Sequence, residues 1–142
     1  MIERVVFDTS SLIGAALRIG STPWTALNLA FERCHVFVSS QTISELENVL
    51  ERPRIARFVP EVGRKEFLAW YRKNSRLVEA PELRAVDVEP WCRDPKDDKF
   101  LAMCLAAHAV VLVSSDHDLL VLHPWRGIPI VTPAQFLTEF SV

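Results

Sequence analysis

The 142-residue sequence lacks several features that would place it in a special class of protein. It has no apolar run near the roughly 20 residues that a membrane-spanning helix needs. It has only four glycines and no biased or repeated tract, which excludes repetitive and low-complexity chains. Its first residues, MIERVVFD, lack the basic start, apolar stretch and small-residue cleavage site of a secretion signal. We therefore expect a cytoplasmic protein.

Cysteine is scarce and scattered. The three cysteines, Cys34, Cys92 and Cys104, form neither a CxxC pair nor a zinc-binding pattern with the four histidines. We expect them to be reduced and to serve a structural role.

The charges are unevenly distributed, although the net charge is only −2. Residues 51–76, which we call the basic segment, carry eight basic and three acidic side chains, a net charge of +5. The rest of the chain has a net charge of −7. A basic segment beside an acidic remainder suggests phosphate binding next to metal binding. The alternative is that the basic segment is a solvated helix face.

Short apolar runs alternate with helical patterns along the whole chain. The runs predict five strands, over residues 2–7, 35–38, 76–79, 110–113 and 128–131. Pro129 has no N–H group to donate to a neighbouring strand, so we expect the last strand at an edge of the sheet. The alternation predicts a single α/β domain over residues 1–142. Its architecture is expected to be a three-layer sandwich around a mostly parallel five-stranded sheet.

Capping signals place helices between these strands. The hydroxyl side chains of residues 9–11 can cap a helix after the first strand. Thr42 and Glu45 have the spacing of a capping box in the helix after the second strand. The remaining segments are expected to form a helical arm, a connecting stretch, a helix and a final helix, over residues 51–76, 81–95, 97–107 and from 133 onward.

Acidic side chains gather where the predicted strands end. They follow the first, second and fourth strands or open the helix before the fourth, and they comprise Asp8, Glu45, Asp94, Asp97, Asp98, Asp116 and Asp118. Functional sites in α/β folds form beyond the carboxyl ends of the strands, so we expect convergence if the first and fourth strands are neighbours. Crowded carboxylates repel one another unless a cation compensates, and Mg²⁺ and Mn²⁺ prefer oxygen ligands. The pattern predicts a metal site that takes a phosphate-bearing substrate.

Each acid also has a purely structural interpretation. The two acids at the helix start can simply favour the positive end of that helix, and the two acids after the fourth strand can be turn residues. Glu45 can be a member of the capping box. Asp8 differs, because a carboxylate that closes an apolar strand is costly there without a role. His117 lies between two acids, but we interpret it as a surface turn residue.

Four runs of the sequence together resemble the PIN-domain ribonucleases. The runs are VVFDTSSLIGA, SELENVL, CRDPKDDKFLAMCLAAHAVVLVSSDHDLL and IPIVTPAQFL, and the third is the most specific. The resemblance covers nearly the whole chain and is closest to the bacterial toxins of toxin–antitoxin pairs, of the VapC type. It implies a PIN-like sheet with strand order 3-2-1-4-5. It also implies an endoribonuclease that depends on Mg²⁺ or Mn²⁺.

The resemblance further implies roles for individual residues. The implied catalytic acids are Asp8, Glu45, Asp97 or Asp98, and Asp116. The implied metal ligands are Asp8, Asp97, Asp116 and the additional acid Asp118, and the supporting residues are Ser10 and Ser114. The DPxD pattern of this branch favours Asp97 as the direct ligand, whereas ungapped spacing back from Asp116 favours Asp98. Helical periodicity does not decide between them, because each acid lies on an apolar stripe of the helix, Asp97 with Leu101 and Asp98 with Ala102 and Leu105.

The resemblance also implies partners. We expect an RNA substrate, a protein antitoxin and a homodimer, and RNA products with 5′-phosphate and 3′-hydroxyl ends. The residues of the basic segment that we expect to bind RNA are Arg64, Lys65, Arg72 and Lys73.

Two other functions fit parts of the pattern. A phosphatase of the haloacid dehalogenase type also begins with a strand and an aspartate, but it needs a second aspartate where this chain has Ser10. Its usual GDxxxD pattern is also replaced here by the residues SDHD at 115–118. A non-catalytic PIN-like module that only binds RNA or protein usually loses the acids, whereas this chain keeps them. Metal-dependent hydrolysis of RNA would separate these functions.

Overall fold

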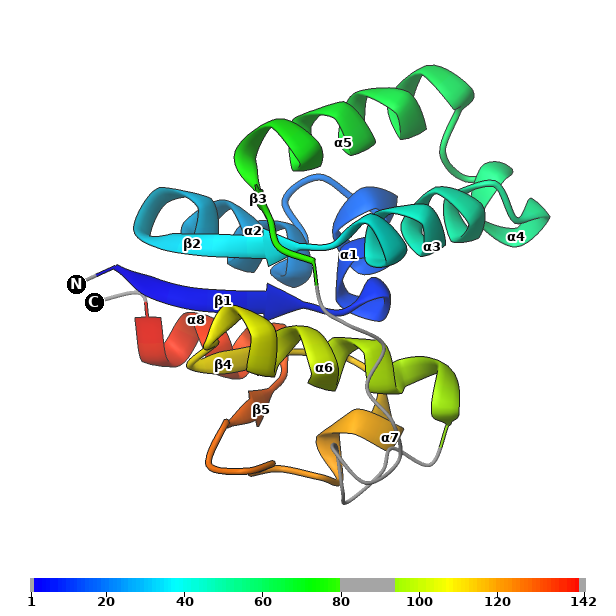
Figure 1. Ribbon diagram of the computed structural model, residues 1–142. Helices are drawn as coiled ribbons and strands as arrows, with labels where there is room; N and C mark the ends of the chain where they lie inside the picture. The colour runs from blue at the N-terminus through cyan, green and yellow to red at the C-terminus, as the bar shows by residue number, and fades with distance from the viewer. Residues whose placement is uncertain (1, 80–93, 141–142) are drawn as a thin grey trace.

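The computed structural model describes residues 2–79 and 94–140. These residues form a five-stranded, all-parallel sheet with helices on both faces (Figure 1). The strand order β3-β2-β1-β4-β5 confirms the predicted order. The strands are β1 (Glu3–Phe7), β2 (Cys34–Val38), β3 (Arg76–Leu77), β4 (Val111–Val113) and β5 (Ile130–Val131).

The helices fill the segments between the strands. They are α1 (Thr9–Leu17), α2 (Thr22–Arg33), α3 (Ser40–Leu50), α4 (Pro53–Ala56), α5 (Glu61–Asn74), the 3₁₀ helix η2 (Pro95–Asp97), α6 (Asp98–Ala107), α7 (His117–Leu120) and α8 (Pro133–Phe140). The four-residue α7 was not predicted, because so short a helix has no apolar period to reveal it.

The two edge strands are shorter than predicted. β3 has two residues instead of the four expected from 76–79, and β5 begins only at Ile130. Pro129 precedes β5, and its carbonyl accepts the N–H of Leu112 at 3.0 Å. β5 lies at the edge of the sheet, as the missing N–H of Pro129 predicted.

Side chains of the central strand pack alternately into two apolar layers, because successive strand residues point to opposite faces of the sheet. Phe7 packs on one face with Leu27 of α2 and with Phe136 of α8, where the two phenyl rings meet edge to face at 5.8 Å. Val6 packs on the other face with Leu101 of α6. In Figure 1, α6 lies in front of the sheet and α2 and α8 lie behind it. The sheet is therefore the middle of three layers, as predicted.

The caps of two helices differ from the sequence-based expectation. Asp8 itself caps α1, and its Oδ1 accepts the N–H of Ser11, so residues 9–11 are not the cap. The capping box of α3 pairs Ser39 with Thr42, not Thr42 with Glu45. Glu45 was therefore misplaced as a capping residue, and its carboxylate is available for contacts outside its own helix.

Two of the cysteines can be located in the fold. Cys34 and Cys104 are buried free thiols, as expected of structural cysteines. Cys92 and most of the predicted connecting stretch, residues 81–93, lie outside the described residues. Among the helices that are described, none has the length and apolar character needed to cross a membrane.

Candidate active site

Asp8 occupies the end of the central strand and is almost fully buried. Only 2 % of its surface is exposed, and its N–H donates to the carbonyl of Val113 on β4 at 3.0 Å. Asp8 thus leaves β1 beside β4, and α1 begins immediately after it. Because β1 and β4 are parallel neighbours, residues that follow either strand meet at the same edge of the sheet.

Serine hydroxyls hold both carboxylate oxygens of Asp8. Ser10 Oγ lies 2.8 Å from each oxygen, and Ser114 Oγ donates to Oδ2 at 2.6 Å. The hydroxyl and the N–H of Ser11 lie 2.9 Å and 3.0 Å from Oδ1. Burial raises the pKa of Asp8, and these hydrogen bonds oppose part of that rise. The carboxylate is consequently fixed in one orientation at the base of the site.

The same hydroxyls extend from Asp8 to the segment after β4. Ser114 Oγ accepts the N–H of Asp116 at 2.9 Å, and Ser10 Oγ accepts the N–H of Ser115 at 3.1 Å. Each serine therefore joins the Asp8 carboxylate to the backbone that carries Asp116. Ser10 and Ser114, the expected supporting residues, both contact Asp8, and Ser11 and the backbone of Ser115 complete the connection.

Asp97 and Asp116 form a pair of interacting carboxylates. Their side chains lie within hydrogen-bonding reach of each other, although Asp97 ends η2 and Asp116 follows β4. Burial, contact with Asp116 and the charges of Asp94 and Asp8 raise the pKa of Asp97 to about 7. Two carboxylates in contact repel each other unless they share a proton or a cation. A proton or a cation between the two carboxylates would relieve this repulsion.

Asp98 and Asp118 lie at the border of this acid pair. Asp98 begins α6, one residue beyond Asp97, and is half-buried. Asp118 is also half-buried, and its N–H donates to Asp116 Oδ1 at 2.9 Å, which makes Asp116 the N-cap of α7. His117 begins α7 and is exposed, so it lies on the surface as expected, but in a helix and not in a turn.

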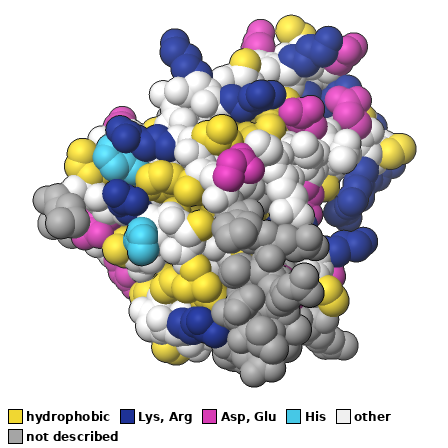
Figure 2. All heavy atoms as spheres, in the orientation of Figure 1, with side chains coloured by type: hydrophobic (Ala, Val, Ile, Leu, Met, Phe, Trp, Pro, Cys, Tyr) yellow, Lys and Arg dark blue, Asp and Glu magenta, His cyan; other side chains and the backbone are white. Residues whose placement is uncertain are grey.

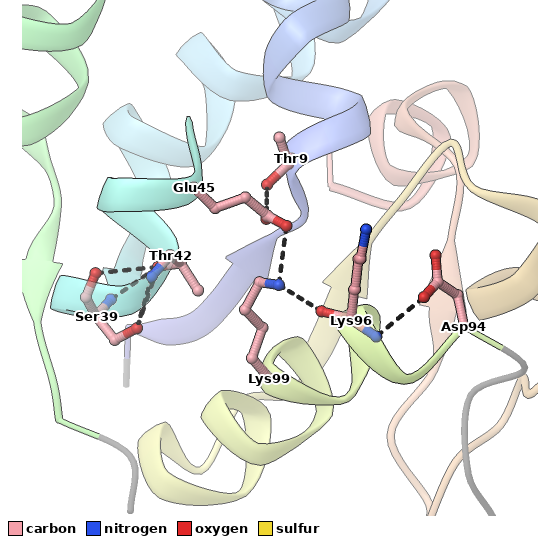
Figure 3. A network of polar contacts seen from close by, with 7 residues as sticks. All are labelled: Thr9, Ser39, Thr42, Glu45, Asp94, Lys96 and Lys99. Carbon is pink, nitrogen blue, oxygen red and sulfur yellow. Dashed lines mark hydrogen bonds and ion pairs between the residues drawn. The ribbon is translucent and has the colours of Figure 1, made fainter. Parts of the chain in front are cut away.

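Glu45 reaches the site from α3 on the other side of β1. The hydroxyl of Thr9 donates to its Oε2, and Lys99 Nζ lies 2.8 Å from its Oε1 (Figure 3). Lys99 also donates to the carbonyl of Lys96, in the turn that leads to Asp97. Glu45 therefore joins α3, α1 and the start of α6 through contacts of its two oxygens.

Comparisons with known proteins identify the fold family. The sequence pattern of the family described as the PIN domain matches residues 4–118, most of the chain. The chain belongs to the PIN domain family. No curated protein sequence matches it, but nine chains among solved structures do. One is the crystal structure of PAE2754 from Pyrobaculum aerophilum, with 17 % sequence identity, a TM-score of 0.66 and coverage of 99 % of this chain and 90 % of that one. At this identity the likeness establishes the fold.

PIN domains are generally nucleases that use divalent metal ions, and the acids of this chain can be tested against that requirement. In residues 2–79 and 94–140, no three His, Cys, Asp or Glu side chains are grouped tightly enough to enclose an ion by themselves. Mg²⁺ needs less, because it commonly binds one or two carboxylates and completes its shell with water and substrate phosphate. The interacting carboxylates of Asp97 and Asp116 offer such a donor pair, with the charge of Asp8 nearby. The residues present therefore fit a hard divalent cation.

The basic segment of this PIN domain lies apart from the acids, on α4 and α5. Figure 2 shows Lys and Arg side chains in this part of the molecule interspersed with Asp and Glu. Lys65 pairs with Glu61 at 3.0 Å and Arg72 with Glu47 at 3.3 Å, and all four side chains are substantially exposed. Lys73 is also exposed. These cations remain accessible to a partner.

Arg64 differs from the other basic residues that we expected to bind RNA. Its side chain is only 11 % exposed, and it donates to the carbonyl of Val59 at 2.6 Å. It also contacts the carbonyl of Ala56 and the carboxylate of Glu51. The guanidinium group closes the loop between α4 and α5, which gives it a structural task that the sequence pattern did not reveal.

Sequence reasoning missed three contributors to the site, Thr9, Ser11 and Lys99. Ser11 and Thr9 were considered only as helix caps, although they flank Ser10 directly after Asp8. The position of Lys99 could have been noticed in the sequence, because a lysine in the first turn of a helix is repelled by the positive end of the helix dipole. A cation in that position needs an acidic partner from elsewhere in the fold, and Glu45 is that partner.

Proposed function

We propose that this PIN domain is a divalent-metal-dependent endoribonuclease, formed by residues 1–142 as one domain, and that it is the toxin of a toxin–antitoxin pair. The observation that carries the nuclease proposal is the contact between Asp97 and Asp116, with the buried Asp8 behind it. The toxin role has separate support, namely the resemblance of the DPxD region to toxins of the VapC type. An antitoxin, a homodimer and a cytoplasmic location belong to this second part of the proposal.

The acids have different roles at the proposed site. Asp97 and Asp116 hold Mg²⁺ or Mn²⁺, and Asp8, kept rigid by the serine hydroxyls, adds negative charge behind them. When bound, the ion supplies charge neutralisation at the phosphate and activation of water for its attack. Asp98 and Asp118 act as outer acids that tune the charge of the pair. Glu45 belongs to the same site through Thr9, which adjoins Asp8 in the chain.

The basic segment has a supporting role in this proposal. Lys65, Arg72 and Lys73 are exposed and can contact the phosphates of single-stranded RNA. Arg64 is omitted from this group because its guanidinium group is engaged by backbone carbonyls. Exposed ion pairs such as Lys65 with Glu61 are weak, so exchange of the acidic partner for a phosphate costs little.

The experiment that tests the proposal is cleavage of a mixed single-stranded RNA pool by the purified full chain. We expect cleavage with Mn²⁺ or Mg²⁺, none with excess chelator, and products with 5′-phosphate and 3′-hydroxyl ends. The Asp116→Asn variant serves as the matched inactive protein, so a contaminating nuclease would reveal itself by equal activity. Undiminished cleavage in chelator would exclude the metal-dependent mechanism. Binding of RNA without any cleavage would favour the non-catalytic module.

A further inference from the structure

The ion pair between Lys99 and Glu45 is more covered than the ion pairs of the basic segment. Its two side chains are 14 % and 25 % exposed, whereas three other ion pairs, formed by Arg64, Lys65 and Arg72 with glutamates, each have at least one partner that is 58 % exposed or more. A covered pair is screened less by water and salt than an exposed one. The pair also lies at the carboxyl end of the sheet, where the other acids converge.

Two segments contact the Lys99 ammonium group, and a third holds its partner Glu45. It lies 2.8 Å from Glu45 Oε1 on α3 and donates to the carbonyl of Lys96 in η2. Glu45 is held in turn from α1, because the hydroxyl of Thr9 donates to Oε2 (Figure 3). Both oxygens of Glu45 are therefore engaged, one of them by a full positive charge.

These contacts divide the site into two parts with different charge balance. Asp97 and Asp116 lie within hydrogen-bonding reach of each other, and their negative charges repel unless a proton or a cation is shared between them. Glu45 already has a cation beside it. A divalent ion at Glu45 would have to displace the ammonium group or bind against its repulsion, and both carboxylate oxygens there already have a donor.

We propose that Lys99 acts as the second cation of the site, neutralising Glu45 and occupying the place of a second divalent ion, so that each chain binds one Mn²⁺ or Mg²⁺. This inference rests on the proposed function, because it concerns the metal of that same site. Lys99 is then a positioning residue, which sets how many ions the acids accept, and Glu45 is its anchor and not a metal ligand.

The test counts Mn²⁺ ions bound to the full chain, by isothermal titration calorimetry and by the electron paramagnetic resonance signal of free Mn²⁺. Wild-type protein is expected to bind one ion. Lys99→Met should add a second, weaker site, because Glu45 loses its cation. The double variant Lys99→Met, Glu45→Gln should return the count to one.

Two further variants keep the test decisive. Lys99→Arg preserves the charge and should retain a single ion, and so should Lys96→Met, which removes an exposed lysine three residues away. Glu45→Gln alone should also leave one ion bound, whatever its effect on turnover. Circular dichroism spectra establish that each variant is folded.

The possible failures can be told apart. Two ions on the wild-type chain, an unchanged count in folded Lys99→Met, or loss of the ion in Glu45→Gln would each overturn the role of Lys99 while leaving a metal-dependent nuclease in place. Absence of any Mn²⁺ binding by wild-type protein would contradict the proposed function itself, and the inference would fall with it.

Discussion

At the scale of single residues, the contact between Asp97 and Asp116 distinguishes two adjacent acids. The sequence left Asp97 and Asp98 as alternative ligands, and the fold brings Asp97 against Asp116 while Asp98 begins α6. Adjacent residues of a helix point about 100° apart, so the two acids do not face the same group equally. The geometry supports Asp97 as the direct ligand, and the assignment remains a proposal.

The first prediction compares these two acids. Asp97→Asn should reduce RNA cleavage far more than Asp98→Asn, because a direct ligand anchors the ion whereas a neighbouring acid only tunes it, by about 10–100-fold. Steady-state cleavage of one defined RNA by both variants, at saturating Mn²⁺, measures the difference. If Asp98→Asn is the more damaging change, the ligand assignment is displaced by one residue although the nuclease proposal survives.

The second prediction concerns the pH dependence of stability without metal. The pKa of Asp97 is raised to about 7, chiefly by burial and by its contact with Asp116. An acid whose pKa is higher in the folded than in the unfolded protein stabilises the fold at low pH, and this contribution is lost as the pH rises through the folded-state pKa. The melting temperature of metal-free protein should therefore fall between about pH 4 and pH 7, because Asp97 loses its proton over this interval.

The matched protein for this measurement is Asp97→Asn, which cannot titrate at that position. Its melting temperature in chelator should vary less with pH over the same interval. Near pH 8 it should be the higher of the two, because the repulsion with Asp116 is removed. Parallel pH profiles for the two proteins would mean that the pKa of Asp97 is not raised in the folded protein.

At the scale of elements, α5 carries two kinds of basic residue. Lys65, Arg72 and Lys73 are exposed, whereas Arg64 is turned into the loop before the helix. The sequence pattern treats all four alike, because charge counts do not reveal burial. The following two predictions separate the two kinds.

The third prediction is that replacing Lys65, Arg72 and Lys73 by Ala weakens RNA binding about equally for all RNA sequences. Phosphate contacts release counterions, so each lost contact should flatten the dependence of log K on log salt by about 0.7 for single strands. Fluorescence anisotropy over a salt series measures both quantities. Arg18→Ala, an exposed arginine outside the basic segment, is the control. An unchanged affinity and slope would make this segment a solvated face.

The fourth prediction is that Arg64→Ala destabilises the fold. The change leaves the carbonyls of Val59 and Ala56 without their donor and opens the loop between α4 and α5. A lost hydrogen bond that leaves a covered group unsatisfied costs about 1–3 kcal/mol. Urea unfolding should therefore show a lower midpoint than for wild-type protein. A change that lowers RNA affinity but not this midpoint would instead make Arg64 a binding residue.

Elements also show which parts of the structure the sequence could predict. β1 and β4 were predictable because both are apolar runs that end at acids, and their parallel pairing brings Asp8 and Ser114 together. The true ends of β3 and β5 were not, because two-residue strands are defined by their neighbours and not by a pattern of their own. The ion pair of Glu45 with Lys99 was also hidden, because it depends on how α3 and α6 pack.

At the scale of the whole molecule, the proposed ion would join distant segments. Asp8 follows β1, Asp97 ends η2 and Asp116 follows β4. A cation among these acids would therefore connect segments that lie far apart in the sequence. A ligand that binds only the folded state stabilises it, by about 2.7 kcal/mol at a concentration one hundred times its Kd.

The fifth prediction follows from this linkage. The melting temperature should rise with Mn²⁺ concentration and return to its starting value when chelator is added, as differential scanning fluorimetry would record. Asp116→Asn should lose most of the rise, whereas Arg18→Ala should keep it. A wild-type melting temperature that does not respond to Mn²⁺ would argue against an ion at these acids.

The central place of β1 also determines when the site can exist during synthesis. β1 is made before the other four described strands, but its partner on one side is β4, and the hydrogen bond from Ser114 to Asp8 spans 106 positions of the chain. Contacts of such large sequence separation form late and slowly. A ribosome-bound chain that has not yet exposed β4 holds Asp8 without Ser114 or Asp116. The proposed catalytic acids are thus kept apart until β4 and the residues directly after it have emerged, so any nuclease activity can begin only beyond that point of synthesis.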